Sequence, residues 1–543
     1  MRREYGALDG ETDPPGPSSS SGGGGWPSWW RLRRQRGGAL GGCASFFGGT
    51  RESVSVANCL MEMQAAVVVS ACVATLSAGL FHRDPAARVD PSLPWSAQVS
   101  HAGANSPTFV SLVHVIAHGG YVLAAPIVGV GVELLGFPVV TALAAALCPL
   151  VASGYAALDF TRVSRGLVRA RLVAGAWKAT HELSTASGNA VAFTPAASAK
   201  AFGWQSATWS VVSVAAPFVI SLLVAPLGVP GVFIALSATG FAVFCAATVL
   251  VLTPWMAAGG DLPPRAPCAP FLPEEEDGDG DGGGDGDGDG DGDGGEGGIV
   301  SNDAKKKAAV LVAASSSPLS PRSTPTESSW ASTCVSMLRD PETLCVIAVS
   351  AAMGAAEYSV AGAVMMLLSG TLSFDASKCA MFLALRELPA VAVQLSAASY
   401  LRVVSVPGTF AAGLALAAGA TAALAALGAA AGAGDGVDRR AVFAAGCAHG
   451  LGVGAVKVAA LPAMSQLVED RHGGMFGVGL GAQGFAQKLA GGAVGMVGLA
   501  VLIELVGFTR ALGWFATALA CSACGAWWFA RGIALRFEGS EET

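Results

Sequence analysis

Charged side chains are scarce in this sequence, since Asp, Glu, Lys and Arg make up only 13% of its 543 residues. Soluble domains carry about a quarter, so the shortage of charge argues against a water-soluble protein of this length. Hydrophobic residues account for 52% instead, and the mean hydropathy is +0.54. The 72 glycines suit close helix packing in lipid. The composition therefore predicts a membrane protein.

A cleavable signal peptide is not expected, because residues 1–53 lack an apolar core. This Gly-, Ser- and Pro-rich stretch predicts a disordered cytosolic segment, and the first apolar run, near Cys59, is expected to act as a signal anchor. A basic face is also missing. The net charge is −7, and a low-complexity run concentrates many of the acidic residues, so no nucleic-acid partner is expected.

The sequence also lacks the motifs of membrane enzymes, because it contains no HExxH, no His-x4-Asp and no Asp-rich diphosphate motif. Enzyme activity is therefore not expected. Most of the 12 cysteines lie in apolar runs, and even Cys521 and Cys524 are expected to pack rather than to bind metal. We expect no metal and no cofactor beyond a coupling ion, with Na⁺ and H⁺ as candidates.

Apolar runs long enough to cross a bilayer core of about 30 Å recur along the chain. They lie near Cys59–Phe81, Thr108–Val132, Phe137–Leu158, Leu167–Phe193, Trp204–Val229, Gly231–Trp255, Leu344–Leu368, Ser377–Tyr400, Gly408–Ala431, Ala441–Leu467, Met475–Val506 and Ala511–Ala530. The pattern predicts an all-α membrane protein with about 12 transmembrane helices in two six-helix halves, residues 54–255 and 341–530.

Residues 256–340 separate the two predicted halves and are expected to form a disordered, acidic cytosolic linker. Within it, Asp277–Gly295 alternates Asp and Gly almost strictly. A calcium-binding loop would need a bidentate Glu at its last position and flanking helices, and neither is present. A flexible solvated spacer is the favoured interpretation, and weak cation binding is the alternative.

The distribution of Lys and Arg predicts a cytosolic N-terminus. Arg31, Arg33, Arg34, Arg36 and Arg51 lie before the first helix, and only Arg83 and Arg88 follow it. With an even number of helices, the linker and the tail (residues 531–543) are cytosolic too. One segment disagrees, because four arginines lie before the fourth helix, on the predicted outer side. They are Arg162, Arg165, Arg169 and Arg171.

Ionisable residues inside membrane helices are costly and mark functional sites by default. In the first half these candidates for ion coupling are Glu62, His114, His118, Lys178 and Glu182. Lys178 and Glu182 share a helix face by their i,i+4 spacing, as a structural ion pair or a coupling site, with Glu182 expected near the cytosolic end. Glu62 could snorkel or bind an ion. The two histidines could relay protons or bond between helices.

In the second half, candidates for substrate binding are Glu357, Arg386, Gln483, Gln487 and Lys488. Lys488 ranks first, because it lies about nine residues inside its apolar run, too deep to snorkel easily, with both glutamines within one turn. Arg386 and its neighbour Glu387 are expected to point in different directions and so to need partners on other helices.

A first family resemblance follows the second helix. Gly129, Glu133 and Gly136 keep the Gly, acid and Gly spacing of the loop 2–3 motif of the major facilitator superfamily. Glycines permit a tight turn and close helix contact, and the acid can cap a helix N-terminus. The resemblance implies a role for these residues in conformational change.

The stretch from Leu461 to Phe508 resembles helices 10 and 11 of the glycoside-pentoside-hexuronide:cation symporter branch, which includes sodium-dependent lysophospholipid symporters. The shared residues are Pro462, Asp470, Arg471, Lys488, Glu504 and Gly507. The resemblance implies that Lys488 lies beside the substrate cavity and that Asp470 and Arg471 belong to a conformational loop. The branch's cation-binding aspartates on helices two and four are not present, and helix two offers His114 and His118 instead.

Together these features predict a secondary active transporter that moves a small solute by alternating access, with or without a coupling ion. The solute is a sugar, an organic anion or a lysolipid-like molecule, and a cation at Lys488 suits an anionic or zwitterionic headgroup. The expected partners are the lipid bilayer and this solute, with the protein monomeric. A non-transporting sensor or scaffold, or a multipass membrane enzyme, is the alternative.

Overall fold

The computed structural model describes most of the chain between residues 50 and 533. The described residues are 50–80, 107–158, 164–193, 195–257, 329–359, 363–364, 367–368, 372, 374, 376–433 and 437–533. The predictions for residues 1–49, for the Asp-Gly run and for residues 534–543 lie outside these ranges, as does Arg162.

The first half is built from long, closely spaced helices. They are α2 (Thr50–Leu80), α4 (Pro107–Leu135), α5 (Phe137–Ala156), α6 (Arg165–Ala192), α7 (Pro195–Ala247), the π-helical η2 (Thr248–Leu252) and α8 (Thr253–Ala257). Gly228 interrupts α7 at φ +66°, a backbone conformation that favours glycine. The predicted fifth and sixth spans are therefore two helices that meet at this residue, and the fifth begins at Pro195, nine residues before the predicted start.

The second half begins with a short helix and continues with long ones. They are α10 (Ser329–Met337), α11 (Pro341–Ser359), α12 (Ala376–Leu395), α13 (Ala397–Val403), α14 (Val406–Gly432), α15 (Arg439–Arg471), α16 (Phe476–Ala490), η5 (Gly491–Gly498), α17 (Leu499–Val506), α18 (Phe508–Phe529) and η6 (Ala530–Gly532). The predicted eighth span bends by 73° between α12 and α13. The eleventh span changes to a π-helix in its glycine-rich middle.

The predicted all-α, multi-pass membrane architecture is confirmed. Each of the twelve predicted apolar runs overlaps a helix. Within the described residues, nine helices are long and apolar enough to cross a membrane, and α12 with α13 makes a tenth. The two spans that fall outside this count are α6, which carries several charged residues, and α11, of which 19 residues are described.

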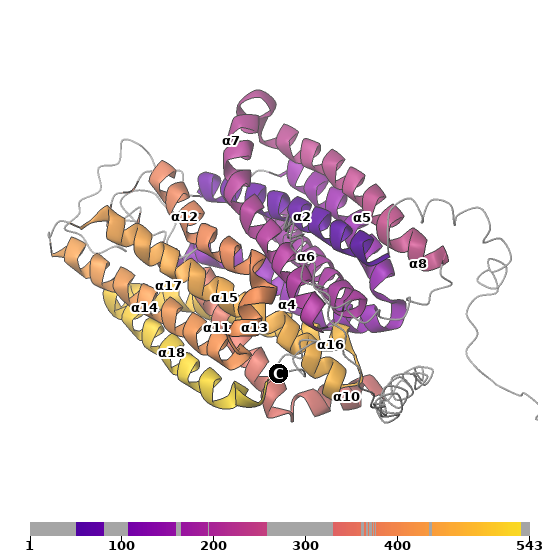
Figure 1. The fold of residues 1–543 in the computed structure, drawn as a ribbon. Coiled ribbons are helices and arrows are strands. Elements are labelled where there is room, and N and C mark those ends of the chain that lie inside the picture. Colours follow the sequence, from indigo (N-terminus) through magenta and orange to yellow (C-terminus); the bar gives the residue numbers. More distant parts are fainter. Residues whose placement is uncertain are drawn as a thin grey trace, which may run out of the picture.

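The helices form two groups that pack side by side, one from each half of the chain (Figure 1). Within the first group α2 and α5 pack on α7, and α4 packs on α6; within the second, α14 packs on α15 and α18. Between the groups, α4 packs on α16, and α7 packs on α12 and α15. The interface between the halves is therefore made by few helices.

Glycine allows a close contact between α4 and α16. A Cβ atom on Gly129 of α4 would lie 2.6 Å from the carbonyl oxygen of Gly477 on α16. Side chains at either position would push the two backbones apart. The end of the bundle where α2 begins and α4 ends, called here the predicted cytosolic end, is thus closed by backbone contact between α4 and α16.

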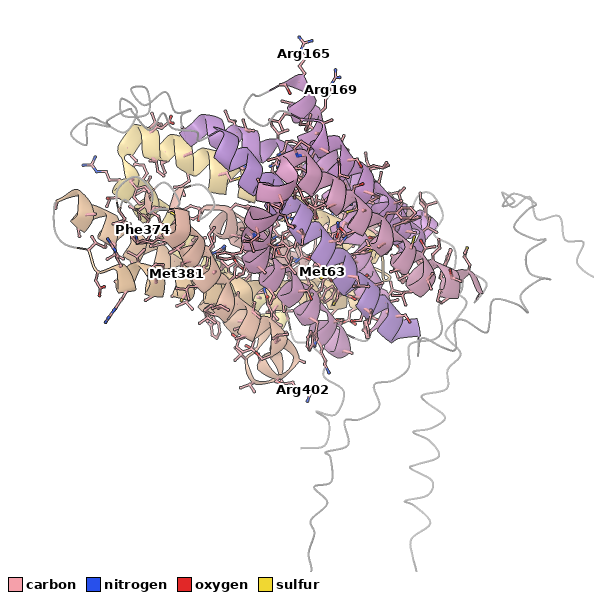
Figure 2. The ribbon with its side chains drawn as sticks, turned by 90° about the horizontal axis from the view of Figure 1, so that it is seen from above. Met63, Arg165, Arg169, Phe374, Met381 and Arg402 are labelled. Carbon is pink, nitrogen blue, oxygen red and sulfur yellow. The ribbon has the colours of Figure 1, made fainter. Side chains whose placement is uncertain are left out.

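The arginines before the fourth helix fall into two groups. Arg165 and Arg169 extend from one end of the bundle, opposite to the end that carries Arg402 (Figure 2). Arg171 is buried, and its guanidinium donates a hydrogen bond to the backbone oxygen of His114 at 3.0 Å. Arg171 therefore belongs to the helix interior and not to a loop, which removes one charge from the conflict with the predicted orientation.

Candidate functional site

Three charged side chains meet between the two halves near the middle of the bundle. Lys488 of α16 lies 3.4 Å from Glu182 of α6, and Lys178, one turn earlier on α6, lies 3.3 Å from the same carboxylate. The ion pair expected from the i,i+4 spacing is thus present, but Glu182 also bridges to the other half. Its expected place near the cytosolic end is wrong, because α6 extends ten residues beyond it to Ala192.

Aromatic rings enclose these charges. The Lys488 ammonium donates a hydrogen bond to the Tyr358 hydroxyl at 2.8 Å and lies 5.3 and 5.5 Å from the ring centres of Tyr358 and Tyr121. His118 packs edge-on against Tyr358, with 4.5 Å between ring centres. The two tyrosines are functional candidates that the sequence analysis missed, although the chain contains only five.

The remaining polar candidates of the second half surround this cluster. Gln487 donates to Glu357 at 3.3 Å, and Gln483 donates to Ser350 at 3.0 Å. Lys457 of α15 is half-buried, and its charge acts on both Glu182 and Glu357. Four of the five predicted substrate-binding residues therefore lie on α11 and α16, close to the inter-half ion pair.

Arg386 contradicts the prediction made for it. Its guanidinium lies 2.8 Å from the carboxylate of Glu387, and its Nε donates to Nδ1 of His449 at 3.5 Å. Adjacent positions on a helix do project about 100° apart, but the long Arg and Glu side chains reach around the helix to meet. Glu387 therefore neutralises Arg386, contrary to the prediction, whereas the expected contact with another helix is present in the hydrogen bond to His449 of α15.

A second polar group lies wholly inside the first half. Glu62 of α2 is buried rather than snorkelling, and its carboxylate lies 2.5 Å from Nε2 of His181 on α6. The Trp177 ring stacks on His181 at 6.2 Å. Of the two alternatives left open for Glu62, snorkelling is wrong, because α2 and α6 place its carboxylate against a histidine.

Four further buried residues continue this group toward the predicted cytosolic end. Asn58, one turn before Glu62, donates to Asn189 at 2.8 Å and to the backbone oxygen of Thr185 at 3.1 Å. Gln205 of α7 accepts from Asn189 at 2.7 Å and donates to the Thr185 hydroxyl at 2.9 Å. We call these six residues, from Glu62 and His181 to Gln205, the polar seam. Most of these residues were not predicted from the sequence, because a single Asn, Gln or Thr in an apolar helix does not by itself indicate a functional site.

The motif residues of loops 2–3 and 10–11 lie at the predicted cytosolic end. The Gly477 N–H, in the first turn of α16, donates to the carboxylate of Glu133 at 2.6 Å, so an acid of the first half caps a helix of the second. Gly136 begins α5 with φ +83°. Arg471 pairs with Asp340 at 2.9 Å and with Glu342 at 2.6 Å.

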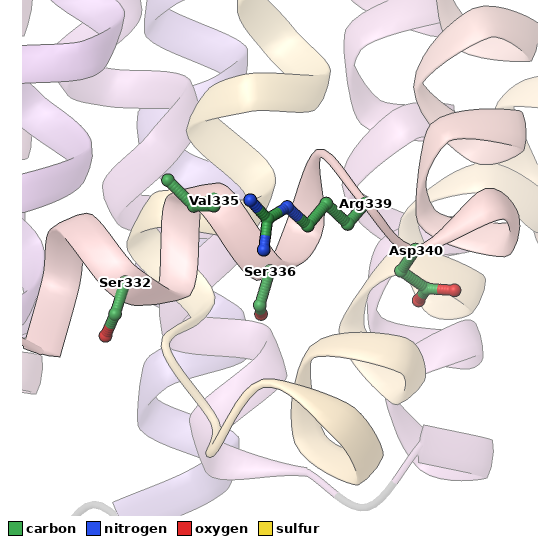
Figure 3. Close-up of a pocket in the computed structure, with 5 residues that line it drawn as sticks. All are labelled: Ser332, Val335, Ser336, Arg339 and Asp340. Carbon is green, nitrogen blue, oxygen red and sulfur yellow. The ribbon is translucent and has the colours of Figure 1, made fainter.

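Asp340 links α10 to α11 beside a surface groove. Figure 3 shows Asp340 and Ser336 lining this groove, to which Ser332, Val335 and Arg339 also contribute. Ser336 and Thr343 both hydrogen-bond His472, at 2.9 and 3.1 Å. Burial alone would raise the pKa of Asp340, but hydrogen bonds from Thr343 and the Glu342 N–H, together with the charge of Arg471, lower it below its ordinary value.

Comparison with known proteins bears on the fold. No family model and no curated protein sequence matches the chain. Among solved structures, the human organic anion transporter MFSD10 (TETRAN) superposes with a TM-score of 0.57 at 15% identity, over 88% of this chain and 99% of that one. The chain has the major facilitator fold.

A second solved structure leads to the same conclusion. The proton:xylose symporter XylE superposes with a TM-score of 0.57 at 11% identity, over 89% of this chain and 97% of that one. The predicted major facilitator-like fold class, with two six-helix halves, is thereby confirmed. The resemblance to the glycoside-pentoside-hexuronide branch is not tested by either neighbour and stays a prediction.

Proposed function

We propose that this protein is a secondary transporter that moves a small organic anion across a membrane by alternating access. The observation that carries the proposal is the buried ion pair between Glu182 and Lys488, which joins the two halves at 3.4 Å. Lys488 is the thirteenth residue of the 31-residue span Phe476–Val506, close to the depth at which major facilitator proteins bind substrate.

Charge balance favours an anionic substrate. Lys178, Lys457 and Lys488 act on Glu182 and Glu357, so three cations face two carboxylates. Glu62, whose charge also acts on Lys178, is paired with His181 and is not counted, which leaves one positive charge in excess. Arg386 is outside this count, because Glu387 neutralises it. A buried charge in excess is costly, and a carboxylate or phosphate group would relieve that cost.

The inter-half pair also suits alternating access. When the halves rock apart on one side, a contact that spans them must break. Glu182 then keeps Lys178 on its own helix, but Lys488 is left as an uncompensated charge, which is costly. An anion bound to Lys488 replaces Glu182 as its partner and so lowers the free energy of the separated state. The printed function of one structural neighbour, an organic anion transporter, agrees with this substrate class.

Uptake into proteoliposomes tests the proposal. The full-length protein is reconstituted and offered radiolabelled succinate, glucose 6-phosphate and tosylate, with neutral xylose for comparison. We expect at least one anion to enter faster than into protein-free liposomes, and Lys488→Ala to abolish that uptake. Lys200→Ala, which removes an exposed lysine of α7, is the matched control and should transport normally.

Two results would contradict the proposal. Absence of flux for every anion, with and without Na⁺ and H⁺ gradients, would favour a non-transporting sensor or scaffold. Anion uptake that survives Lys488→Ala unchanged would remove Lys488 from the substrate site.

A further inference from the structure

The Glu62–His181 pair is the most deeply buried acid–base contact between two helices of the first half. Nε2 of His181 and the Glu62 carboxylate are 2.5 Å apart, and both side chains are almost inaccessible, at 1% and 8% exposure. A single proton held between them leaves the pair neutral overall. Without that proton the pair carries one negative charge at a depth where an unpaired charge is costly.

The proposal rests on the proposed anion transport and names its coupling ion. We propose that the Glu62–His181 pair is the proton-binding site of this transporter, and that its proton moves together with the anionic substrate. Histidine is suited to this role because each of its ring nitrogens can donate or accept a hydrogen bond, depending on where the proton lies.

Lys178 connects the proton site to the substrate site. Its ammonium is held by Glu182 at 3.3 Å and is also attracted by the charge of Glu62. His181 and Glu182 are adjacent on α6, so one points to α2 and the other to Lys488 of the second half. A change of charge on the Glu62–His181 pair therefore alters the electrostatic interaction of Lys178 with Glu182, and through Glu182 that of Lys488.

The direction of coupling follows from these contacts. When the pair has lost its proton, the negative charge of Glu62 draws Lys178 away from Glu182, which is left to hold Lys488 more tightly. When a proton binds, Glu62 no longer competes, Lys178 returns to Glu182, and Lys488 is released to bind an anion. Proton and anion thus favour each other's binding, which is the requirement for symport.

Other titratable groups around the pair are few. The charge of Glu62 acts on Cys59 of α2, and the charges of Lys178 and Lys488 act on His118 of α4. In the described residues α5 carries no charged side chain, and α7 carries only Lys200, which is exposed. Lys457 and Glu357 of the second half act on Glu182 and Lys178 rather than on the pair itself.

The polar seam gives the pair its connection toward the predicted cytosolic end. Thr185 and Asn189 follow His181 at i,i+4 spacing on α6, while Asn58 precedes Glu62 by one turn on α2. The Thr185 hydroxyl donates to the backbone oxygen of His181 at 2.9 Å. These residues lie on the side of the pair toward the predicted cytosolic end, and the side chains of His181 and Glu182 project about 100° apart on α6.

Infrared difference spectroscopy on the reconstituted full-length protein, without any substrate, tests proton binding. Spectra recorded between pH 5 and pH 8, roughly the range in which histidine titrates, should contain carboxyl and imidazole bands. We expect Glu62→Gln and His181→Asn each to remove both bands, and Glu504→Gln, an exposed carboxyl at the far end of its helix, to leave them unchanged. Bands in Glu62→Gln identical to those of the unmodified protein would overturn the proposal.

A second arm tests symport. Each panel anion is added to liposomes loaded with a pH-sensitive dye, and the interior is expected to acidify as the anion enters; Glu62→Gln should lose this acidification. Anion uptake without proton movement would overturn the symport proposal and leave anion transport standing. If no anion enters but the infrared bands titrate, anion transport fails instead, and the proton site stands on the first arm.

Discussion

The two halves of the molecule satisfy their buried charges in different ways. In the first half, Glu62 pairs with His181 on a neighbouring helix of the same half. The side-chain hydrogen bonds described for the polar seam also join residues of that half. In the second half, Lys488 pairs with a carboxylate across the interface, on Glu182. A charge whose partner lies in the opposite half loses that partner when the halves separate, whereas one paired within a half does not. In the proposed transport, Lys488 would therefore exchange partners while the Glu62–His181 pair stays together.

Breaking the inter-half ion pair should have the largest effect. We expect Glu182→Ala to lower the free energy of unfolding by about 3–5 kcal/mol, because it leaves buried Lys488 uncompensated. The double variant Glu182→Ala/Lys488→Ala should recover much of that loss. Thermal unfolding in detergent measures both, and a double variant less stable than either single one would show that the pair is not coupled in this way.

The contact between α4 and α16 should be the next most sensitive. Gly129→Ala places a Cβ atom 2.6 Å from the Gly477 carbonyl oxygen, and such overpacking costs about 1–3 kcal/mol. The same substitution at Gly131, whose Cβ would meet nothing within 4 Å, is the control. Cross-linking of cysteine pairs placed at the predicted cytosolic ends of α4 and α16 should report separation in Gly129→Ala alone.

The polar seam should respond more weakly than either interface between the halves. Hydrogen bonds between membrane helices contribute about 0.6 kcal/mol and rarely more than about 1.7. We therefore expect Asn189→Ala, which removes bonds to Asn58 and Gln205, to lower the unfolding free energy by about that much. If Asn189→Ala lowered the free energy of unfolding as much as Glu182→Ala, the comparison would fail. The polar seam would then depend on a single side chain as strongly as the inter-half ion pair does.

Asp340 should give an effect as small as that of the polar seam, with a defined pH dependence. It caps the start of α11 and pairs with half-exposed Arg471, contacts that together contribute about 1 kcal/mol. Because its pKa is lowered in the folded protein from an ordinary value of 3.8, this contribution is complete above about pH 4 and is lost as the pH falls through the lowered pKa. Unfolding of Asp340→Asn should lack this acid-dependent part.

The membrane class and the number of spans followed from the sequence because they depend on local properties. An apolar run of about 20 residues forms a helix in lipid whatever surrounds it, since its backbone polar groups must be satisfied internally. The break between α12 and α13 was missed because a bend interrupts an otherwise apolar run, whereas the break at Gly228 lies within two residues of the predicted one. The need of Lys488 for a partner was also visible, because a cation deep inside such a run is costly when it is unpaired.

The partners themselves came only from the tertiary structure. Glu62 and His181 are 119 residues apart in the chain, and Glu182 and Lys488 are 306 apart (488 − 182), so no local pattern pairs them. Which face of a helix meets which neighbour depends on packing between α2, α4, α6 and α16. The sequence by itself determined that this chain crosses the membrane many times with charges inside its helices. The fold decided which charges meet, because helix packing alone brings distant faces within a few ångströms of each other.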